Sequence, residues 1–233
     1  NSNYEDVASK FWEHYVYIAN AMNSLHDPAR SLWDEEDGFF YDVLRYPNGG
    51  FHKFRVRSLV GLIPLFAVEV LHDEDLKPHP DFLASVDWFL NNRPELVGHI
   101  CYSDVRNGVQ RHVLSVVDQP QLARILERLW DPDEFLSEAG IRSLSKVHEQ
   151  HPFVFDARVV RYEPAEADTK IKGGNSNWRG PIWFPTSFLI IESLVKFGDA
   201  FGPAFKVKTR GSDRALSPHE MAEDIANRMI RLF

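Results

Sequence analysis

Cysteine is nearly absent from this sequence, and that absence excludes two kinds of architecture. Cys101 is the only cysteine, so the chain has no pair for a disulfide framework and no thiolate cluster for a structural zinc site. Ten histidines are present, but they are scattered, with no pair at the i, i+4 spacing of metal ligands on one helix face. We therefore expect neither a metal nor another cofactor.

The sequence also lacks an excess of basic residues and any long apolar run. Its formal net charge is −8, which argues against non-specific binding to nucleic acid. No run approaches the roughly 20 apolar residues that a membrane span needs, and residues 1–6 do not resemble a secretory signal. We expect a cytoplasmic protein that binds neither nucleic acid nor a membrane.

What the sequence does contain is enough apolar material for a sizeable core, since 44% of its 233 residues are hydrophobic and 13% are aromatic. Helical spacing predicts six helices, and alternation between turn residues predicts short strands. The expected helices cover 4–23, 58–71, 81–91, 119–130, 186–197 and 221–232, and the expected strands cover 39–44, 51–57, 97–102, 110–117 and 154–162. Residues 137–151 are too mixed for a prediction.

Three of these helices carry more specific expectations. The aromatic residues of 4–23 should face the core, and 186–197 is so rich in apolar residues that it should be buried nearly all round. Ser217 and Glu220 form a capping box that opens the last helix. No β-α-β alternation predicts a parallel sheet, so we expect a mainly α fold with helices in concentric layers.

An aromatic loop ahead of the helix 186–197 is the strongest functional feature. Trp178 and Trp183 lie among glycines and prolines in the stretch 173–185, a composition typical of an ordered loop. Either the protein core or the face of a sugar ring covers such indoles. Asn175, Asn177 and Arg179 place amide and guanidinium groups beside them, as hydroxyl recognition requires.

An acidic turn forms a second candidate. Four acids at 34–37 separate Trp33 from Gly38 and three aromatic residues. Some of these acids should cap a helix, bind a cation or remain solvated. At least one of Asp34 and Asp37 should point into a pocket.

Together these stretches resemble glycoside hydrolase family 63, which contains the processing α-glucosidases and the bacterial mannosylglycerate and glucosylglycerate hydrolases. The resemblance rests on 175–183, where the family has a Trp-Arg-Gly-Pro-x-Trp signature, and on the supporting motifs 32–42 and 56–62. It runs through most of the chain and is nearest to the large bacterial members, of the mannosyl-oligosaccharide glucosidase type.

The resemblance implies a partial (α/α)6 barrel with short β-hairpins, in which 1–233 is a single, incomplete domain from the central part of the catalytic domain. It also implies cation-free, inverting hydrolysis of an α-linked glucoside or oligosaccharide. The residues carried over to the substrate pocket are Trp33, Asp37, Tyr41, Asn177, Trp178, Arg179, Gly180 and Trp183.

The family's general acid precedes the region that matches Asn1, and its general base follows the region that matches Phe233. Neither motif occurs here, so we expect the chain to shape the pocket and to need the remainder of the catalytic domain. By itself it should be inactive.

Other interpretations remain open. The chain can be a self-contained carbohydrate-binding or scaffold module without catalysis. Catalysis within the chain would use Asp34 or Asp37 as the acid and Glu163 or Glu166 as the base, which is a weak hypothesis in a chain with 34 acidic residues. Arg57 and Arg179 can be structural, with Arg57 paired to an acid of the turn.

Overall fold

The structure is a computed structural model that describes residues 4–23, 27, 30–106, 108–165 and 178–233. These residues group into two compact units. Unit 1 comprises Asn1–Leu32 and Ala67–Asp118, and unit 2 comprises Trp33–Phe66 and Gln119–Phe233. The assignment of 1–233 to a single domain stays a prediction.

The helices of unit 1 are α1 (Glu5–Asn23), α2 (Asp73–Leu76), α3 (Pro80–Asn92) and α4 (Pro94–Val97). The predictions of helices at 4–23 and 81–91 are therefore confirmed. The prediction that the aromatic residues of α1 face the core is confirmed for Trp12, which is 4% exposed, and is wrong for Phe11, which is 70% exposed. Trp12 packs edge-on against Phe89 of α3, with ring centroids 6.4 Å apart.

Unit 1 also contains an antiparallel sheet in the order β5-β7-β6, formed by β5 (Val68–His72), β7 (Val109–Ser115) and β6 (Cys101–Arg106). The prediction of a helix over 58–71 is wrong for its second part. Val68 and Val70 are β-branched and alternate along β5, and this pattern suits the pleated pairing with β7 better than a helix. The strand predicted at 97–102 lies later, because Pro94 begins α4.

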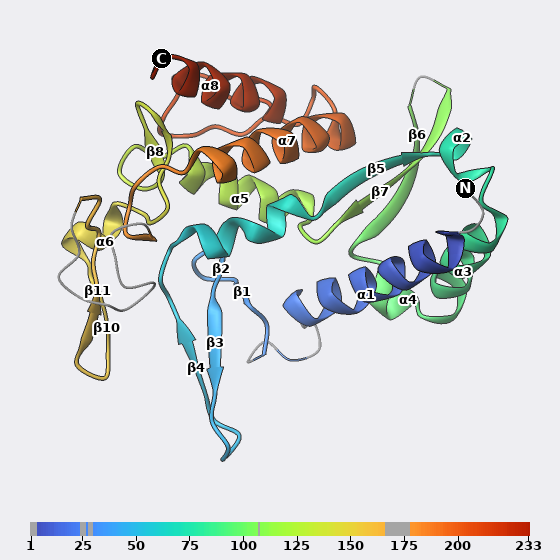
Figure 1. Ribbon diagram of the computed structural model, residues 1–233, viewed down its shortest axis with the longest axis horizontal. Coiled ribbons are helices and arrows are strands. Elements are labelled where there is room, and N and C mark those ends of the chain that lie inside the picture. The colour runs from blue at the N-terminus through green and yellow to red at the C-terminus, as the bar shows by residue number, and fades with distance from the viewer. Residues whose placement is uncertain (1–3, 24–26, 28–29, 107, 166–177) are drawn as a thin grey trace. The chain divides into compact units, whose positions relative to one another are not determined.

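In the described part of unit 2 the strands pair as antiparallel hairpins, most of which are labelled in Figure 1. They pair β1 (Trp33–Asp34) with β2 (Phe39–Phe40), β3 (Asp42–Arg45) with β4 (Phe51–Phe54), β8 (Leu136–Ser137) with β9 (Gly140–Ile141), and β10 (Phe153–Phe155) with β11 (Arg158–Val160). The predicted strands 39–44 and 154–162 are thus each divided by a turn or a break. In the second case the turn consists of Asp156 and Ala157, both with positive φ.

The helices of unit 2 are η2 (Leu59–Phe66), α5 (Gln119–Leu129), α6 (Val147–Gln150), α7 (Phe184–Phe201) and α8 (Pro218–Ile230). The predictions at 119–130, 186–197 and 221–232 are confirmed, as is the capping box of Ser217 and Glu220. η2 is a 3-10 helix and not an α-helix. Its Pro64 lies inside the helix, where the missing N–H removes one backbone hydrogen bond.

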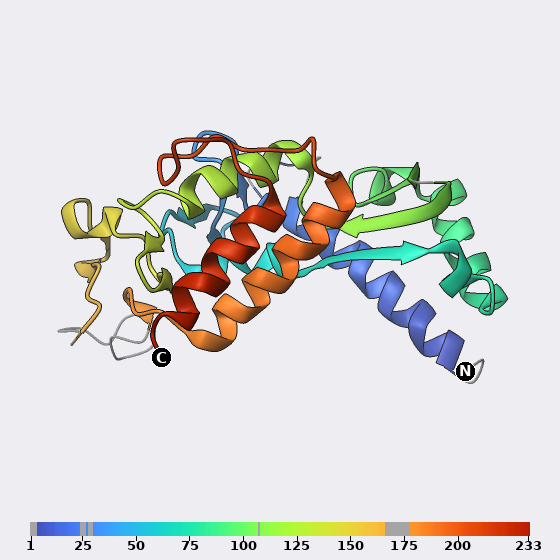
Figure 2. The same ribbon diagram turned by 90° about the horizontal axis from the view of Figure 1, so that it is seen from above.

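Helices α7 and α8 lie side by side along their length (Figure 2). Ile190, Leu194 and Phe197 of α7 are buried. The prediction that this helix is buried nearly all round is wrong, because Phe188 remains 54% exposed. α7 therefore has one covered apolar face and one uncovered apolar face.

The whole is rich in helix, with short antiparallel strand pairs, in agreement with a mainly α class. The described strands contain no parallel pair. The (α/α)6 barrel stays a prediction. Within the described ranges, no helix has both the length and the apolar character to cross a membrane.

Candidate functional site

The side chain of Asp34 holds the acidic turn between β1 and β2 through a hydrogen bond and two ion pairs. A carboxylate oxygen of Asp34 accepts the Asp37 N–H at 3.0 Å, and Lys53 and Arg55 lie 3.4 and 3.1 Å from the other oxygen. Gly38 has a φ of +63°, and a Cβ there would lie 2.3 Å from the Arg124 side chain. The positive φ of the turn therefore favours glycine at position 38.

Arg57 lies at the centre of a polar cluster that contacts this turn. Its guanidinium lies 2.9 Å from Asp37, 3.0 Å from Glu134 and 3.2 Å from the Tyr41 hydroxyl. Arg128 donates to Glu134 at 2.7 Å and to the Asp37 carbonyl. The structural interpretation of Arg57 is thus confirmed, and Asp37 and Tyr41 are tied to one guanidinium.

These contacts set the charge of the two aspartates. Burial alone would raise the pKa of Asp37, but the hydrogen bond from Tyr41 and the charges of Arg57 and Arg128 outweigh it and hold the pKa below its usual value. The pKa of Asp34 is likewise lowered, because the Asp37 N–H and the charges of Lys53 and Arg55 outweigh burial. A general acid needs a raised pKa, so this environment does not suit either carboxyl for proton donation.

The segment 140–145 joins the acidic turn to the tryptophan loop, and sequence reasoning missed it. Ser145 donates from its hydroxyl to Glu134 at 3.0 Å and from its N–H to the Arg57 carbonyl at 2.9 Å. Ser143 donates its N–H to the Pro181 carbonyl at 3.0 Å, and its hydroxyl accepts the Gly180 N–H at 3.1 Å. The available signal was the alternation of these serines with Leu144, which is also buried.

Arg179 and Gly180 form the rigid part of the tryptophan loop. Arg179 is fully buried, its guanidinium lies 3.1 Å from Glu163, and its carbonyl accepts the Glu163 N–H at 2.7 Å. Gly180 has a φ of +139°, and a Cβ there would lie 2.3 Å from the Tyr162 ring. Both residues hold the loop in place, as the structural interpretation of Arg179 requires.

Trp178 and Trp183 stack on each other, with ring centroids 5.0 Å apart and planes 9° from parallel. Trp183 is half-buried, and Trp178 is 37% exposed. Neither interpretation of the sequence included this pairing. Each ring covers one face of the other, and Trp178 has the larger exposed fraction of the two.

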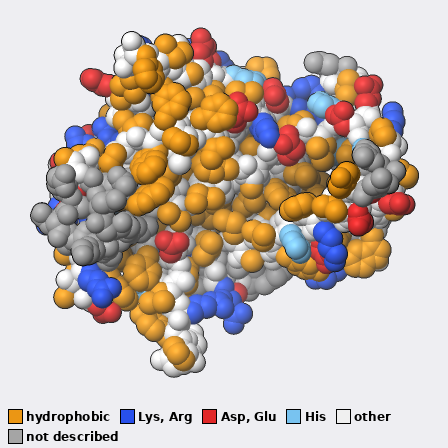
Figure 3. All heavy atoms as spheres, viewed as in Figure 1, with side chains coloured by type: hydrophobic (Ala, Val, Ile, Leu, Met, Phe, Trp, Pro, Cys, Tyr) orange, Lys and Arg blue, Asp and Glu red, His pale blue; other side chains and the backbone are white. Residues whose placement is uncertain are grey.

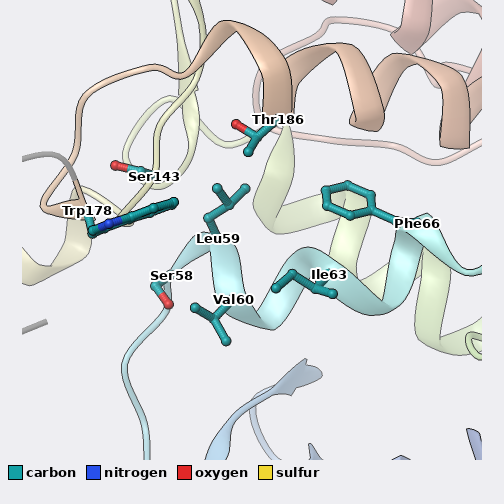
Figure 4. A pocket seen from close by; sticks show the side chains of 8 residues that line it. All are labelled: Ser58, Leu59, Val60, Ile63, Phe66, Ser143, Trp178 and Thr186. Carbon is teal, nitrogen blue, oxygen red and sulfur yellow. The ribbon is translucent and has the colours of Figure 1, made fainter. Parts of the chain in front are cut away.

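Trp178 lines a hollow of about 350 Å³, here called the apolar hollow (Figure 4). Its walls are Ser58, Leu59, Val60, Ile63, Phe66, Ser143, Trp178 and Thr186. The residues Leu59, Val60 and Ile63 lie along η2, while Thr186 comes from the start of α7. The Thr186 hydroxyl donates to the Trp183 carbonyl at 3.1 Å, so part of the small hydrogen-bonding capacity of this hollow is already used.

A second hollow, of about 680 Å³ and here called the charged hollow, lies against the acidic turn. It is lined by Asp37, Arg124, Glu127, Arg128, Asp131, Glu134, Lys208, Thr209, Arg210 and Ser212. The expectation that Asp34 or Asp37 points into a pocket is confirmed for Asp37. The lining carries both signs of charge, and Arg210 pairs with Asp131 at 2.9 Å.

Of the eight predicted site residues, seven are described by the structure, and two of these seven line a hollow. Trp178 lines the apolar hollow and Asp37 the charged one. Trp33 and Tyr41 are buried, and Trp33 packs on Phe40 with ring centroids 5.0 Å apart. Asn177 lies outside the described residues, as do Asn175 and Glu166. A role of these residues in substrate binding stays a prediction.

Metal ligands require several donor side chains in one place. In the part of the chain that the structure describes, no three His, Cys, Asp or Glu residues are grouped as a metal site would need.

Comparison with known proteins gives two matches. The family model of the glycosyl hydrolase family 63 C-terminal domain matches residues 12–213. The uncharacterized protein YMR196W of Saccharomyces cerevisiae is 45% identical over 252 residues, a match that covers 100% of this chain and 23% of the yeast protein. The chain thus spans about a quarter of the length of this relative.

Proposed function

This chain belongs to the family of the glycosyl hydrolase family 63 C-terminal domain, and we propose that it forms part of the catalytic domain of an inverting α-glycosidase. Its substrate class is an α-linked glucoside or oligosaccharide, and the nearest functional type is the bacterial mannosyl-oligosaccharide glucosidase. The proposal gives the chain the role of shaping the substrate pocket, while other polypeptide supplies the general acid and base.

The family match over residues 12–213 carries the glycosidase part of this proposal, and the pairing of the candidate carboxylates carries the non-catalytic role of the chain. Inverting glycosidases need two carboxyls about 6.5 to 9.5 Å apart, one of them protonated to donate to the leaving oxygen. Asp34, Asp37 and Glu163 each lie next to an arginine at about 3 Å, and the two aspartates have lowered pKa values. Such carboxylates serve as fixed structural charges, which supports a pocket-forming role over a catalytic one.

The exposed surface of Trp178 supports the choice of a sugar as the ligand. A pyranose ring presents C–H groups on its faces, and these stack on an indole as other apolar groups do. Trp178 lines the apolar hollow and is held in orientation by Trp183 and by the rigid Arg179-Gly180 backbone. A sugar bound here needs polar partners beyond the hydroxyls of the hollow, and the proposal assigns them to Asn177 and to the remainder of the domain.

The remainder of the catalytic domain is the expected partner of this chain. The yeast relative continues well beyond the matched region, which is 23% of its length. We propose that residues 1–233 form an incomplete single domain, the central part of an (α/α)6 barrel, in a cytoplasmic protein without a cofactor.

The test is an activity assay on two polypeptides with α-linked glucosides and oligosaccharides as substrates. The 233-residue chain is expected to show no turnover. The complete natural polypeptide that carries these residues is expected to release the β-anomer, which NMR detects directly as inversion. Turnover by the 233-residue chain that is lost in Asp34→Asn or Asp37→Asn would place catalysis inside the chain and overturn the proposal.

A non-catalytic carbohydrate-binding module is the second candidate. It is favoured by the fact that Trp178, its stacking partner Trp183 and the apolar hollow are all within this chain. Titration of the 233-residue chain with maltooligosaccharides, followed by tryptophan fluorescence, separates the two. Saturable binding, together with absence of hydrolysis by the complete polypeptide, would favour the module.

A further inference from the structure

Unit 1 carries a hydrogen-bonded series of three side chains that the proposed function does not use. The Ser103 hydroxyl lies 2.7 Å from Nδ1 of His112, and Nε2 of the same ring lies 2.8 Å from Oδ1 of Asp73. The three residues come from β6, β7 and α2. Acidic and histidine side chains reach the surface over α2 and the β6–β7 hairpin (Figure 3). An alcohol, an imidazole and a carboxylate in this order form the arrangement with which many hydrolases activate a serine.

The register of the sheet brings Ser103 and His112 together. The two residues lie directly opposite each other in the antiparallel pairing of β6 with β7. Ser115 donates its N–H to the Ile100 carbonyl at 2.8 Å, and hydrogen-bonded and non-hydrogen-bonded pairs alternate along the ladder from that point. Ser103 and His112 therefore form a non-hydrogen-bonded pair, the kind in which opposite side chains lie closest.

Asp73 determines which nitrogen of His112 carries the proton. Helix α2 packs against β5 and β7, which places Asp73 beside the ring. In its carboxylate form Asp73 can only accept a hydrogen bond, so Nε2 donates to it and Nδ1 keeps its lone pair. The Ser103 hydroxyl then donates to Nδ1, which is the direction that removal of its proton requires.

The site is open to solvent at the edge of the sheet. Ser103 is exposed, and the side chains of His112 and Asp73 are 26% and 40% exposed. β6 is an outer strand of the described sheet. Because Ser103 belongs to a non-hydrogen-bonded pair, its backbone N–H points to the open edge and not to β7. The N–H of a nucleophilic serine is one of the donors that stabilise a developing oxyanion.

We propose that Ser103, His112 and Asp73 form a nucleophilic site that cleaves esters of small acyl groups. Val105 lies on the same face of β6, two residues after Ser103, and is 64% exposed, so it offers an apolar contact to a short acyl chain. The three residues lie in unit 1, apart from every residue predicted for the sugar pocket. The site thus goes beyond the proposed function and does not depend on it.

The reaction has two steps that the same three residues serve. Nδ1 of His112 takes the Ser103 proton while Oγ bonds to the ester carbonyl carbon. The bond from that carbon to the alcohol oxygen breaks, and the alcohol leaves with the proton from His112. Water then gives one proton to His112 and its hydroxyl to the acyl carbon, which releases the acid, and Ser103 regains its proton. Asp73 stabilises the positive charge on the ring in both steps.

The test is covalent labelling of the complete natural polypeptide that carries these residues. Diisopropyl fluorophosphate phosphorylates serines that a neighbouring base activates. Peptide mass spectrometry is expected to find the adduct at Ser103 and none at Ser85, a half-buried serine of α3. The second measurement is the rate of p-nitrophenyl acetate hydrolysis, which should fall to the buffer rate in Ser103→Ala. No adduct at Ser103, or an unchanged rate in Ser103→Ala, would overturn the proposal.

Matched variants test the positioning role of Asp73. Asp73→Asn is expected to lower the hydrolysis rate about 100-fold, the size of a general-base contribution, and Asp73→Glu should restore part of it. Asp75→Asn, at an exposed position on the same helix, should leave the rate unchanged. Equal rates in Asp73→Asn and Asp75→Asn would overturn the three-residue site.

A second matched pair tests the base. His112→Gln should lose both the adduct and the hydrolysis, while His99→Gln, at an exposed position in the same unit, should keep both. Loss in both variants would mean that surface imidazoles react with the ester directly, and it would overturn the site. Presence or absence of glycosidase activity alters none of these outcomes, so this site and the proposed function fail separately.

Discussion

The two hollows of unit 2 differ in the chemistry of the residues that line them. The apolar hollow contains Trp178 and Phe66 and no charged residue. The charged hollow contains four basic residues, four acidic residues and no aromatic ring among its lining residues. A site that binds a sugar needs both a stacking surface and groups that bind hydroxyls. Here each hollow supplies one of these requirements.

The segment 140–145 shows that the hollows are nevertheless connected in structure. Ser145 contacts the Arg57 cluster and Ser143 contacts Gly180 in the tryptophan loop. A change in the charged cluster can therefore move the wall of the apolar hollow through a few hydrogen bonds. Four predictions separate what each hollow contributes, beginning with the largest expected effect.

Replacement of Arg57 by alanine should cause the largest loss of stability among the changes around the charged hollow. It removes the guanidinium that binds both Asp37 and Glu134, which then keep Arg128 as their cationic neighbour. Loss of one partner from a buried pair costs about 3 to 5 kcal/mol, and because these side chains are 10% to 21% exposed, we expect about 3 kcal/mol of unfolding free energy. Urea denaturation measures it.

Arg55→Ala is the matched control, since Arg55 pairs with Asp34 but is 50% exposed. Its cost should stay below about 1 kcal/mol, as for surface ion pairs. If both variants cost the same, the charged cluster is not the rigid element described above.

Gly180→Ala should cause the largest loss of stability among the changes around the apolar hollow. A methyl group there would lie 2.3 Å from the Tyr162 ring at a φ of +139°, so we expect a loss of about 2 kcal/mol from overlap and backbone strain. Near-ultraviolet circular dichroism should also show an altered Trp178–Trp183 pair.

Gly49→Ala serves as the comparison, because Gly49 has a positive φ but no neighbour within 4 Å of a Cβ. It should cost only the backbone strain, about 1 kcal/mol. Equal losses in the two variants would mean that Tyr162 moves aside and does not fix the loop.

Lowering the pH should selectively destabilise the region around the charged hollow. Asp34 and Asp37 have folded-state pKa values below the ordinary 3.8. Their contribution to stability is therefore complete above about pH 4 and is lost as the pH falls through the lowered pKa values. Asp37→Asn should flatten this acid limb in a stability profile between about pH 2 and 6, while Asp213→Asn, at an exposed position, should not. An unchanged profile in Asp37→Asn would contradict the assignment.

Trp178→Ala should have the smallest effect on stability and the most specific effect on binding. Trp178 is 37% exposed and stacks on Trp183, so we expect to lose about 1 kcal/mol or less of stability. Isothermal titration of the complete polypeptide with an α-linked oligosaccharide should show weaker binding than in Trp88→Ala, which removes an exposed tryptophan of unit 1. Equal affinities in the two variants would remove Trp178 from the sugar site.

The parts of the fold that could be predicted are those in which the local pattern has one solution. The helices α3, α5 and α8 combine amphipathic spacing with start signals such as Pro80 and the Ser217–Glu220 capping box. The run 58–72 has apolar residues on every side, so period alone could not separate the 3-10 helix from the strand after it. The uncovered face of α7 was also unpredictable, because sequence reports which residues are apolar but not what covers them.

The candidate site was predictable as two motifs but not as an arrangement. Local sequence identified the turn at Asp37 and the loop at Trp178. It could not give the contact of Arg57 with Glu134, because these residues are 77 positions apart. The stacking of Trp178 on Trp183 likewise depends on the path of the loop, which Glu163 and Tyr162 determine from outside the motif.

The clamp between Glu163 and Arg179 has a consequence for the chain that separates them. An ion pair and a backbone hydrogen bond fasten residues 163 and 179 to each other, so whatever sequence connects them starts and finishes at one anchored point. Each doubling of the length of such a connection costs only about 0.6 kcal/mol in closure entropy. Because Trp178 directly precedes Arg179, this anchored point fixes where the indole pair starts, whatever the length of the connecting chain.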